Sequence, residues 1–215
     1  EIIFYEEPDD LIEPFTRIVK NFPRVILASK SAVRKQQLID NSIPFEVIVS
    51  KADETPDKSK SFKNQLAEIS MRKAQTVFEM TKDRGLRLII AGDQNIVFND
   101  IMYGKPKSID EARNLIRNMR GSDEVYAYTG NAVLLAENNK ILQSVNITDV
   151  ARLSVDDISD EEIEDYLKDG NCLSLCGGIS INSALFVHLK EGRLSTAKGM
   201  TLEFAKEMMS SLTEY

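Results

Sequence analysis

Two short polar stretches of this sequence have the residue types to bind and cleave a phosphate compound. The first begins at Ser29, where the apolar run 25–28 gives way to two serines, a lysine and a helical pattern that includes Arg34. A strand that leads directly into a helix leaves the first N–H groups of the helix unpaired, and hydroxyls and basic side chains beside them complete an anion site. We interpret Ser29, Ser31 and Arg34 as a phosphate site. A well-capped basic surface helix is the alternative that this pattern leaves open.

The second stretch is Gly92-Asp93-Gln94, which follows the apolar run 86–91. The carboxyl ends of strands are where ligands bind in open α/β sheets, so Asp93 is a candidate catalytic carboxylate, with an ordinary Asp turn as the alternative. Lys73 falls on the apolar face of the helix predicted for residues 62–82, where it either points into a cleft or extends to solvent. Lys105 lies in a tight connection that lacks the serine or threonine of a Walker A loop.

The composition argues against several classes of protein. The formal net charge of −7 argues against a general nucleic-acid binder, and no apolar run reaches the length of a membrane span. Residues 1–23 carry charges throughout and lack a signal-peptide core, so we expect a cytoplasmic protein. With two cysteines and one histidine, a structural zinc site and histidine catalysis are not expected. We expect Cys172 and Cys176 to pack as small apolar groups.

Hydrophobic periodicity alternates between strands and helices, which predicts an α/β fold. Capping boxes at Ser108 and Ser159 mark two helix starts, and an antiparallel hairpin is expected from the runs 125–136 and 141–153. We expect further strands at 45–49, 96–98 and 184–189, and a last helix at 202–212. We predict one domain, 24–215. Residues 1–23 would form an extension that packs on it, with an amphipathic helix in which Leu11, Phe15, Ile18 and Val19 share a face.

A set of short motifs, taken in their order along the chain, resembles the motifs of the Maf (septum formation inhibitor-like) family of nucleotide pyrophosphatases. The resemblance extends from about Arg24 to the C-terminus. The motifs are Ala28-Ser-Lys-Ser-Ala-Val-Arg34, Asp53-Glu54, Lys73-Ala74, Gly92-Asp93-Gln94, Gly104-Lys105-Pro106, Thr129-Gly130 and Glu161-Glu-Ile163 with Tyr166. The resemblance implies an elongated, mixed and twisted sheet flanked by helices, with two lobes around a cleft, as in the inosine triphosphate pyrophosphatases. It also implies hydrolysis of a nucleoside triphosphate to the monophosphate and pyrophosphate, and a homodimer.

The resemblance assigns roles to individual residues of this sequence. Asp93 matches the family's catalytic aspartate, and Lys73 and Lys105 match further catalytic positions. Glu54 and Asp93 would hold Mg²⁺ or Mn²⁺, which prefer oxygen ligands. The remaining matches are to substrate-binding positions, with the phosphates at Ser29, Ser31 and Arg34 and the base at Val33, Gln94 and Asn182.

Some positions depart from the family pattern. Val33 stands where many members have an arginine, Asn182 where they have Gln or Glu, and Ser174-Leu175 where they have a charged residue. Gln94, the run 53–56 and the absence of a histidine after Gly121 resemble the branch that prefers 7-methyl-GTP. We therefore expect activity on 7-methyl-GTP together with UTP or CTP. A nucleotide-binding regulator of division without turnover and an enzyme for deaminated purine triphosphates are the alternatives.

Overall fold

The computed structural model describes residues 2–3 and 23–212. These residues form an eight-stranded sheet in the order β1-β3-β2-β4-β6-β7-β8, with β5 paired to β4. Strands β2 (Arg24–Leu27) and β3 (Phe45–Val47) run parallel to each other, and β2 also runs parallel to β4 (Leu86–Phe98). The rest of the sheet is antiparallel. The mixed α/β sheet with flanking helices confirms the predicted fold class.

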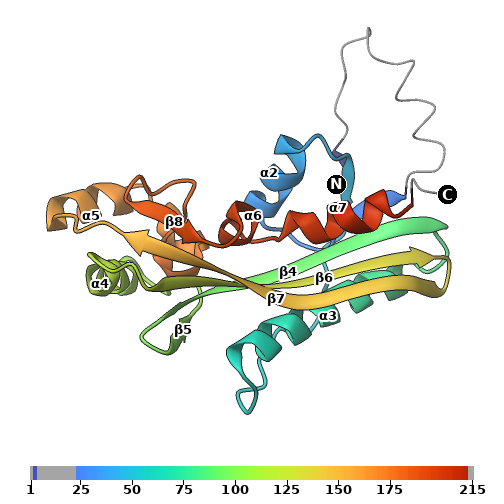
Figure 1. Cartoon of the computed structure of the whole chain (residues 1–215), viewed down its shortest axis with the longest axis horizontal. Coiled ribbons are helices and arrows are strands. Elements are labelled where there is room, and N and C mark those ends of the chain that lie inside the picture. The colour runs from blue at the N-terminus through green and yellow to red at the C-terminus, as the bar shows by residue number, and fades with distance from the viewer. Residues whose placement is uncertain (1, 4–22, 213–215) are drawn as a thin grey trace, which may run out of the picture.

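The sheet is elongated because three of its strands are long (Figure 1). Strand β6 (Val125–Glu137) pairs with β4 on one side and with β7 (Lys140–Val155) on the other. Strand β8 (Val187–Glu191) pairs with the end of β7, and β5 (Ile101–Tyr103) returns along β4. The predicted hairpin of two long strands is therefore confirmed.

Strand β4 differs from the prediction of two short strands with a turn between them. It is continuous from Leu86 to Phe98, because β6 pairs with it from Leu86 to Val97. Asp93 therefore lies within a strand and not in a turn after it. The parallel neighbour β2 stops opposite Ile90. Beyond Ile90, and therefore at Asp93, β4 has no β2 residue paired beside it. The sequence predicts Asp93 at the end of its own strand, whereas in the structure it is the end of the neighbouring strand β2 that leaves space beside Asp93.

Helices cover both faces of one end of the sheet (Figure 1). Helix α3 (Phe62–Met80) packs on one face through Ala74 and Val77 against the buried side chains of β2, β4 and β6. The other face holds α2 (Ala32–Asp40), α6 (Leu194–Lys198) and α7 (Leu202–Ser210). Leu38 of α2 and Met208 of α7 pack there with the same strands. Strands covered on both faces explain the continuous apolar runs of β2 and β4.

The opposite end of the sheet has its own hydrophobic core. It contains α4 (Ile109–Met119), α5 (Asp160–Leu167) and the short 3₁₀ turns η2 (Asn171–Ser174) and η3 (Cys176–Gly178). Ile116 and Ile163 are fully buried in this cluster together with residues of β6, β7 and β8. Both predicted helix caps are present, and Ser159 forms a complete capping box with Glu162.

The remaining predicted boundaries shift by a few residues. The strand expected at 45–49 ends at Val47, the strand expected at 184–189 is Val187–Glu191, and the last helix ends at Ser210. In the N-terminal extension, β1 (Ile2–Ile3) pairs antiparallel with β3. The amphipathic helix predicted around Leu11, Phe15, Ile18 and Val19 lies outside the described residues. The C-terminal boundary at 215 does so as well.

Gly130 of β6 lets α3 lie close to the strand that carries Asp93. It pairs with Asp93 in the sheet, and a Cβ atom at position 130 would lie 2.3 Å from the carbonyl oxygen of Leu66 in α3. Real Cβ atoms do not approach backbone oxygen so closely, so a larger residue must displace α3. The missing side chain therefore sets the distance between α3 and the site.

We predict that Gly130→Ala lowers the free energy of unfolding by roughly 1–3 kcal/mol, as expected for overpacking at a rigid backbone contact. Urea unfolding measures this change. Gly104→Ala is the matched control, because the nearest atom to a Cβ there is 3.5 Å away. Equal stability of the two variants would show that α3 is not held by this contact.

Candidate active site

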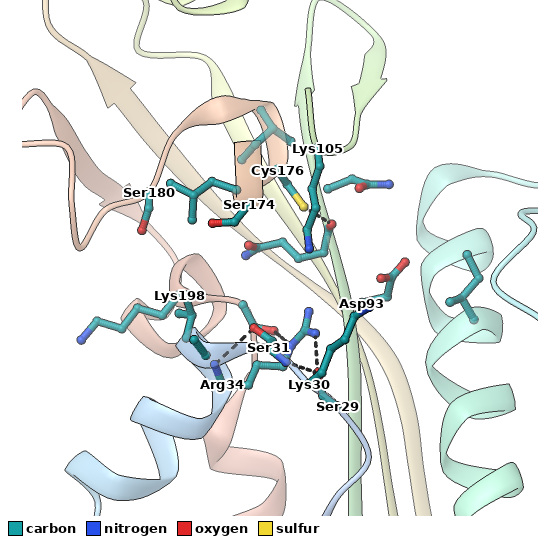
Figure 2. A pocket seen from close by; sticks show the side chains of 18 of the residues that line it. Ser29, Lys30, Ser31, Arg34, Asp93, Lys105, Ser174, Cys176, Ser180 and Lys198 are labelled. Atoms are coloured by element: carbon teal, nitrogen blue, oxygen red, sulfur yellow. Dashed lines mark hydrogen bonds between the residues drawn. The ribbon is translucent and has the colours of Figure 1, made fainter. Parts of the chain in front are cut away.

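A cavity of about 830 Å³ opens beyond the end of β2, between the two ends of the molecule. Figure 2 shows side chains that project into it from both sides. One side is the segment from Ser29 to Arg34 with Lys198 and Gly199 of the α6 region. The other side is formed by Lys105 and by the segments 174–176 and 179–181. Strand β4 runs along the cavity, as the two-lobed arrangement predicts.

The start of α2 is a set of hydrogen-bond donors that face this cavity. Ser31 is the N-cap, and its side chain accepts from the Arg34 N–H. Ser29 Oγ accepts both from the Ser31 N–H, at 3.2 Å, and from Arg34 Nη1, at 3.3 Å, so its own hydrogen stays available. Ala32 and Val33 occupy the first turn of the helix, where N–H groups have no intrahelical partner. These donors stand where the sequence predicts an anion site, at 29–34.

Arg34 is a buried cation that has no carboxylate partner among the described residues. It is 9% exposed, and its Nε donates to the carbonyl oxygen of Gly199 at 2.7 Å. Burial lowers the pKa of the Arg34 guanidinium, and the nearby Asp93 carboxylate opposes that shift. A buried charge is stable only when it is paired, so the remaining donors of this guanidinium favour an anionic ligand.

Lys73 brings the two predicted carboxylates of the site together. Its Nζ lies 2.9 Å from Glu54 Oε2 and 3.3 Å from Asp93 Oδ1. The Lys73 side chain is 9% exposed, so it does not extend to solvent and points instead into the cavity. Helix α3 supplies the lysine, β4 supplies Asp93, and the loop after β3 supplies Glu54.

The other predicted residues divide into those that reach the cavity and one that does not. Val33, Gln94 and Lys105 line it, and Lys105 is exposed. Asn182 is exposed, does not line the cavity, and donates its main-chain N–H to Ser180 Oγ at 3.2 Å. The prediction of Asn182 as a base contact is therefore not supported by its position, because its neighbours Ser180 and Ile181 occupy the wall.

The sequence pattern already places Lys30 at this anion site, but sequence reasoning missed a further cation of the cavity, Lys198. Lys30 stands between the two recognised serines, and Lys198 lies in a segment without a recognisable motif. Five cationic and two anionic side chains line the cavity, which gives it a net charge of +3 in a chain of formal charge −7. The cations are Lys30, Arg34, Lys73, Lys105 and Lys198, and the anions are Glu54 and Asp93. Such a local excess suits a polyanion.

The residues around this cavity lie in a region of sequence that is shared with a known protein family. The sequence profile of the Maf-like protein family matches residues 24–212. The chain belongs to the Maf family. The profile covers both sides of the cavity, and the motif residues Ser29, Glu54, Lys73, Asp93 and Lys105 line it.

The similarity of this chain to other proteins of the family extends over almost the whole length of those proteins. The chain is 31% identical over 192 residues to a nucleoside triphosphate pyrophosphatase of Synechococcus sp. (strain JA-2-3B'a(2-13)), which covers 88% of this chain and 94% of that protein. It is 26% identical over 192 residues to a dTTP/UTP pyrophosphatase of Bdellovibrio bacteriovorus, with 87% and 98% covered. A solved nucleoside-triphosphatase / dITP/XTP pyrophosphatase from Mycobacterium abscessus is 14% identical, with 89% of this chain and 94% of that chain covered and a TM-score of 0.36.

A helix that spans a membrane must be both long and apolar. In the described ranges 2–3 and 23–212, no helix of this Maf protein combines the necessary length with sufficient hydropathy.

The two cysteines of this Maf protein have different environments. Cys172 is buried in the core beside α5, as expected for a small apolar group. Cys176 instead lines the cavity, and its S–H donates to the main-chain oxygen of Gln94 at 2.7 Å. Burial, with a contribution from Asp93, raises the pKa of the Cys176 thiol to about 11. Cys176 packs only partly buried against that core, so the expectation of two cysteines packed as small apolar groups holds in full for Cys172 and in part for Cys176.

We predict that Cys176 reacts slowly with iodoacetamide at neutral pH, because the thiolate is the reacting form. A rise of the pKa from 9.0 to about 11 lowers the thiolate fraction at pH 7.5 by on the order of 10²-fold. In a Cys172→Ser background, the alkylation rate of the folded protein should rise about tenfold per pH unit up to pH 10. The urea-unfolded control should level off near pH 9. A plateau near pH 9 in the folded protein would contradict the assignment.

Proposed function

We propose that this protein is a nucleoside triphosphate pyrophosphatase, which hydrolyses its substrate to the nucleoside monophosphate and pyrophosphate. One observation carries the proposal. The guanidinium of Arg34 is buried and has no carboxylate partner among the described residues, and it lines the same cavity as the Glu54–Lys73–Asp93 cluster. An anion site beside a positioned carboxylate suits the attack of water on a phosphoanhydride. The names of the similar Maf-family proteins, nucleoside triphosphate and dTTP/UTP pyrophosphatase, support the same reaction.

The phosphates bind at the start of α2 in this proposal. The free N–H groups of the first turn and the Ser29 hydroxyl donate to phosphate oxygens, and Arg34 adds a charge-assisted bond. Lys105 approaches from the other side of the cavity (Figure 2). These donors neutralise negative charge on the triphosphate, which would otherwise oppose the approach of a nucleophile's electron pair to phosphorus.

Asp93 acts on the water. The water oxygen forms a bond to the α-phosphorus while the bond from that phosphorus to the bridging α–β oxygen breaks, and pyrophosphate leaves. The water proton passes to the Asp93 carboxylate, which acts as general base. Lys73, 3.3 Å from Asp93 Oδ1, holds that carboxylate in place and adds positive charge beside the reacting phosphate.

Mg²⁺ or Mn²⁺ is part of this proposal. The part of the chain that the structure describes contains no cluster of three His, Cys, Asp or Glu side chains arranged for a metal. Mg²⁺ commonly uses only one or two carboxylates together with substrate phosphates, and Glu54 and Asp93 converge on Lys73 Nζ. These two carboxylates fit such an ion and would hold it. The ion would supply Lewis-acid stabilisation of the phosphate charge.

The finer part of the proposal concerns the base. The features of Gln94 and residues 53–56 that resemble the 7-methyl-GTP branch support that substrate, and the relatives named for dTTP and UTP support a pyrimidine. We propose 7-methyl-GTP together with UTP or CTP as substrates of the same site.

Pyrophosphate release from a panel of nucleoside triphosphates tests the function. The panel holds 7-methyl-GTP, UTP, dTTP, CTP, GTP, ATP and ITP, each with Mg²⁺, with Mn²⁺ and with excess EDTA. We expect pyrophosphate and monophosphate in equal amounts and none with EDTA. Binding of a nucleotide without turnover of any member would instead support the alternative of a regulator of cell division. Turnover of ITP alone would support the alternative role in removing deaminated purines.

A further inference from the structure

The side chain of Gln94 is fixed in a way that the sequence does not reveal. Its Nε2 donates to Thr129 Oγ1 at 3.0 Å, to the carbonyl oxygen of Thr196 at 3.0 Å and to that of Ala197 at 3.3 Å. Backbone carbonyl oxygens can only accept hydrogen bonds, so the nitrogen of the amide must face them. If the amide were flipped, its oxygen would face the carbonyl oxygens of Thr196 and Ala197, and these two oxygen–oxygen contacts are unfavourable.

The other amide atom is open to the cavity. Gln94 Oε1 accepts no hydrogen bond from the described residues and is not enclosed by them. Because both hydrogens of Nε2 are used by Thr129, Thr196 and Ala197, Gln94 can offer a ligand only an acceptor.

Gln94 lies on the opposite side of β4 from the charged cluster around Asp93. Successive residues of a strand face opposite ways, so Asp93 points toward Lys73 of α3 and Gln94 toward the α6 region. Charged groups dominate the Asp93 side. On the Gln94 side the cavity wall is largely apolar and is formed by Val33, Ile96, Leu153, Leu175, Ile179 and Ile181.

Of the polar side chains near this apolar wall, Ser174 Oγ already donates to the carbonyl oxygen of Asn171 at 2.8 Å and can only accept from a ligand, whereas two others can donate. Ser180 Oγ accepts from the Asn182 N–H, which leaves its own hydrogen to donate, and Lys198 has no ion pair in the described part of the chain. Both lie on the opposite side of the cavity from Asp93 (Figure 2). The Gln94 acceptor together with these two donors suits the edge of a keto base, in which an imino N–H lies beside two carbonyl oxygens in uracil and thymine and beside one in guanine.

We propose that Gln94 Oε1 is a fixed acceptor that reads the imino N–H of a keto base: uracil, thymine or guanine, methylated or not. The proposal rests on the function proposed above and adds the rule for base choice. Cytosine and adenine present a bare ring nitrogen at the corresponding position, so CTP and ATP should be poor substrates. Of the two pyrimidines named above, this rule selects UTP.

Base analogues test the rule on the wild-type protein. The kcat/KM for 3-methyl-UTP, which lacks the imino hydrogen, should fall by on the order of 10²-fold or more relative to UTP, because a site built to accept a hydrogen bond rejects a ligand without one. The 5-methyl analogue adds the same methyl group and keeps the hydrogen, so its kcat/KM should stay within about fivefold of that of UTP.

Gln94→Met keeps the size of the side chain and removes the acceptor. We expect the UTP to 3-methyl-UTP ratio to fall toward 1 in this variant, with the ratio unchanged in the exposed control Gln143→Met. A wild-type ratio near 1, or a preference for CTP over UTP, would overturn the rule while leaving the pyrophosphatase reaction in place. A Gln94→Met protein that retains the wild-type ratio would also overturn it. Absence of turnover on every triphosphate would instead contradict the proposed function.

Discussion

Replacement of Asp93 by asparagine should lower kcat by 10²-fold or more, while the protein stays folded. The substitution keeps the shape of the side chain but removes the charge that takes the proton from water, and general bases contribute about 10²–10⁴-fold. It also removes the charge that Lys73 contacts at 3.3 Å. Because Asp93 is partly exposed at the cavity and not in the core, the melting temperature should change by only a few degrees.

Asp100→Asn is the matched control for this prediction. Asp100 lies on the same β4–β5 hairpin, is exposed and does not line the cavity, so its loss of charge should leave kcat unchanged. Pyrophosphate release under saturating substrate measures both variants. Wild-type kcat in a folded Asp93→Asn protein would remove this residue from the role of base.

Arg34→Ala should raise the KM for the triphosphate by on the order of 10- to 100-fold. The guanidinium is expected to contribute about 1.5–3 kcal/mol to phosphate binding through charge-assisted hydrogen bonds. Raised salt should weaken binding by the wild-type protein less than expected for surface charges, because Arg34 is buried and poorly screened. Monophosphate and pyrophosphate should lose affinity as well, which product inhibition can measure.

Two further variants separate binding from structure. Arg34 also donates to the Gly199 carbonyl oxygen, so the alanine variant needs a measured unfolding curve. Arg34→Lys keeps the charge but loses the fork of donors, and we expect an intermediate KM. Lys35→Ala, the next residue on α2 and outside the cavity wall, should leave KM unchanged. An equal KM in Arg34→Ala and Lys35→Ala would exclude Arg34 from the phosphate site.

Local patterns predicted much of the fold. Continuous apolar runs identified β2 and β4 as buried strands, and the serine caps at 108 and 159 identified the starts of α4 and α5. The prediction broke β4 at Gly92-Asp93-Gln94, whose polar residues interrupt the apolar run. Pairing with β6 over the whole strand overrides that local signal. Such long-range pairing is not visible in the sequence of either strand.

The site was predictable where a residue has an unusual position in a local pattern. Lys73 stands on an apolar helix face, and Ser29 and Arg34 stand at a helix start, so the sequence alone marked them. Lys198 and Cys176 were missed because their segments reach the cavity only through tertiary packing. The orientation of the Gln94 amide depends on carbonyl oxygens about a hundred residues away, so no local pattern could reveal it.

The central claim is that water attacks the α-phosphorus of a nucleoside triphosphate. Turnover of UTP in ¹⁸O-labelled water, followed by mass spectrometry of both products, tests it most directly. The account predicts one ¹⁸O atom in UMP and none in pyrophosphate, because the water oxygen bonds to the α-phosphorus and pyrophosphate leaves with the bridging oxygen. Label in pyrophosphate with none in UMP would mean attack at the β-phosphorus. Label in orthophosphate, with UDP as the other product, would mean attack at the γ-phosphorus, and either result would contradict the account.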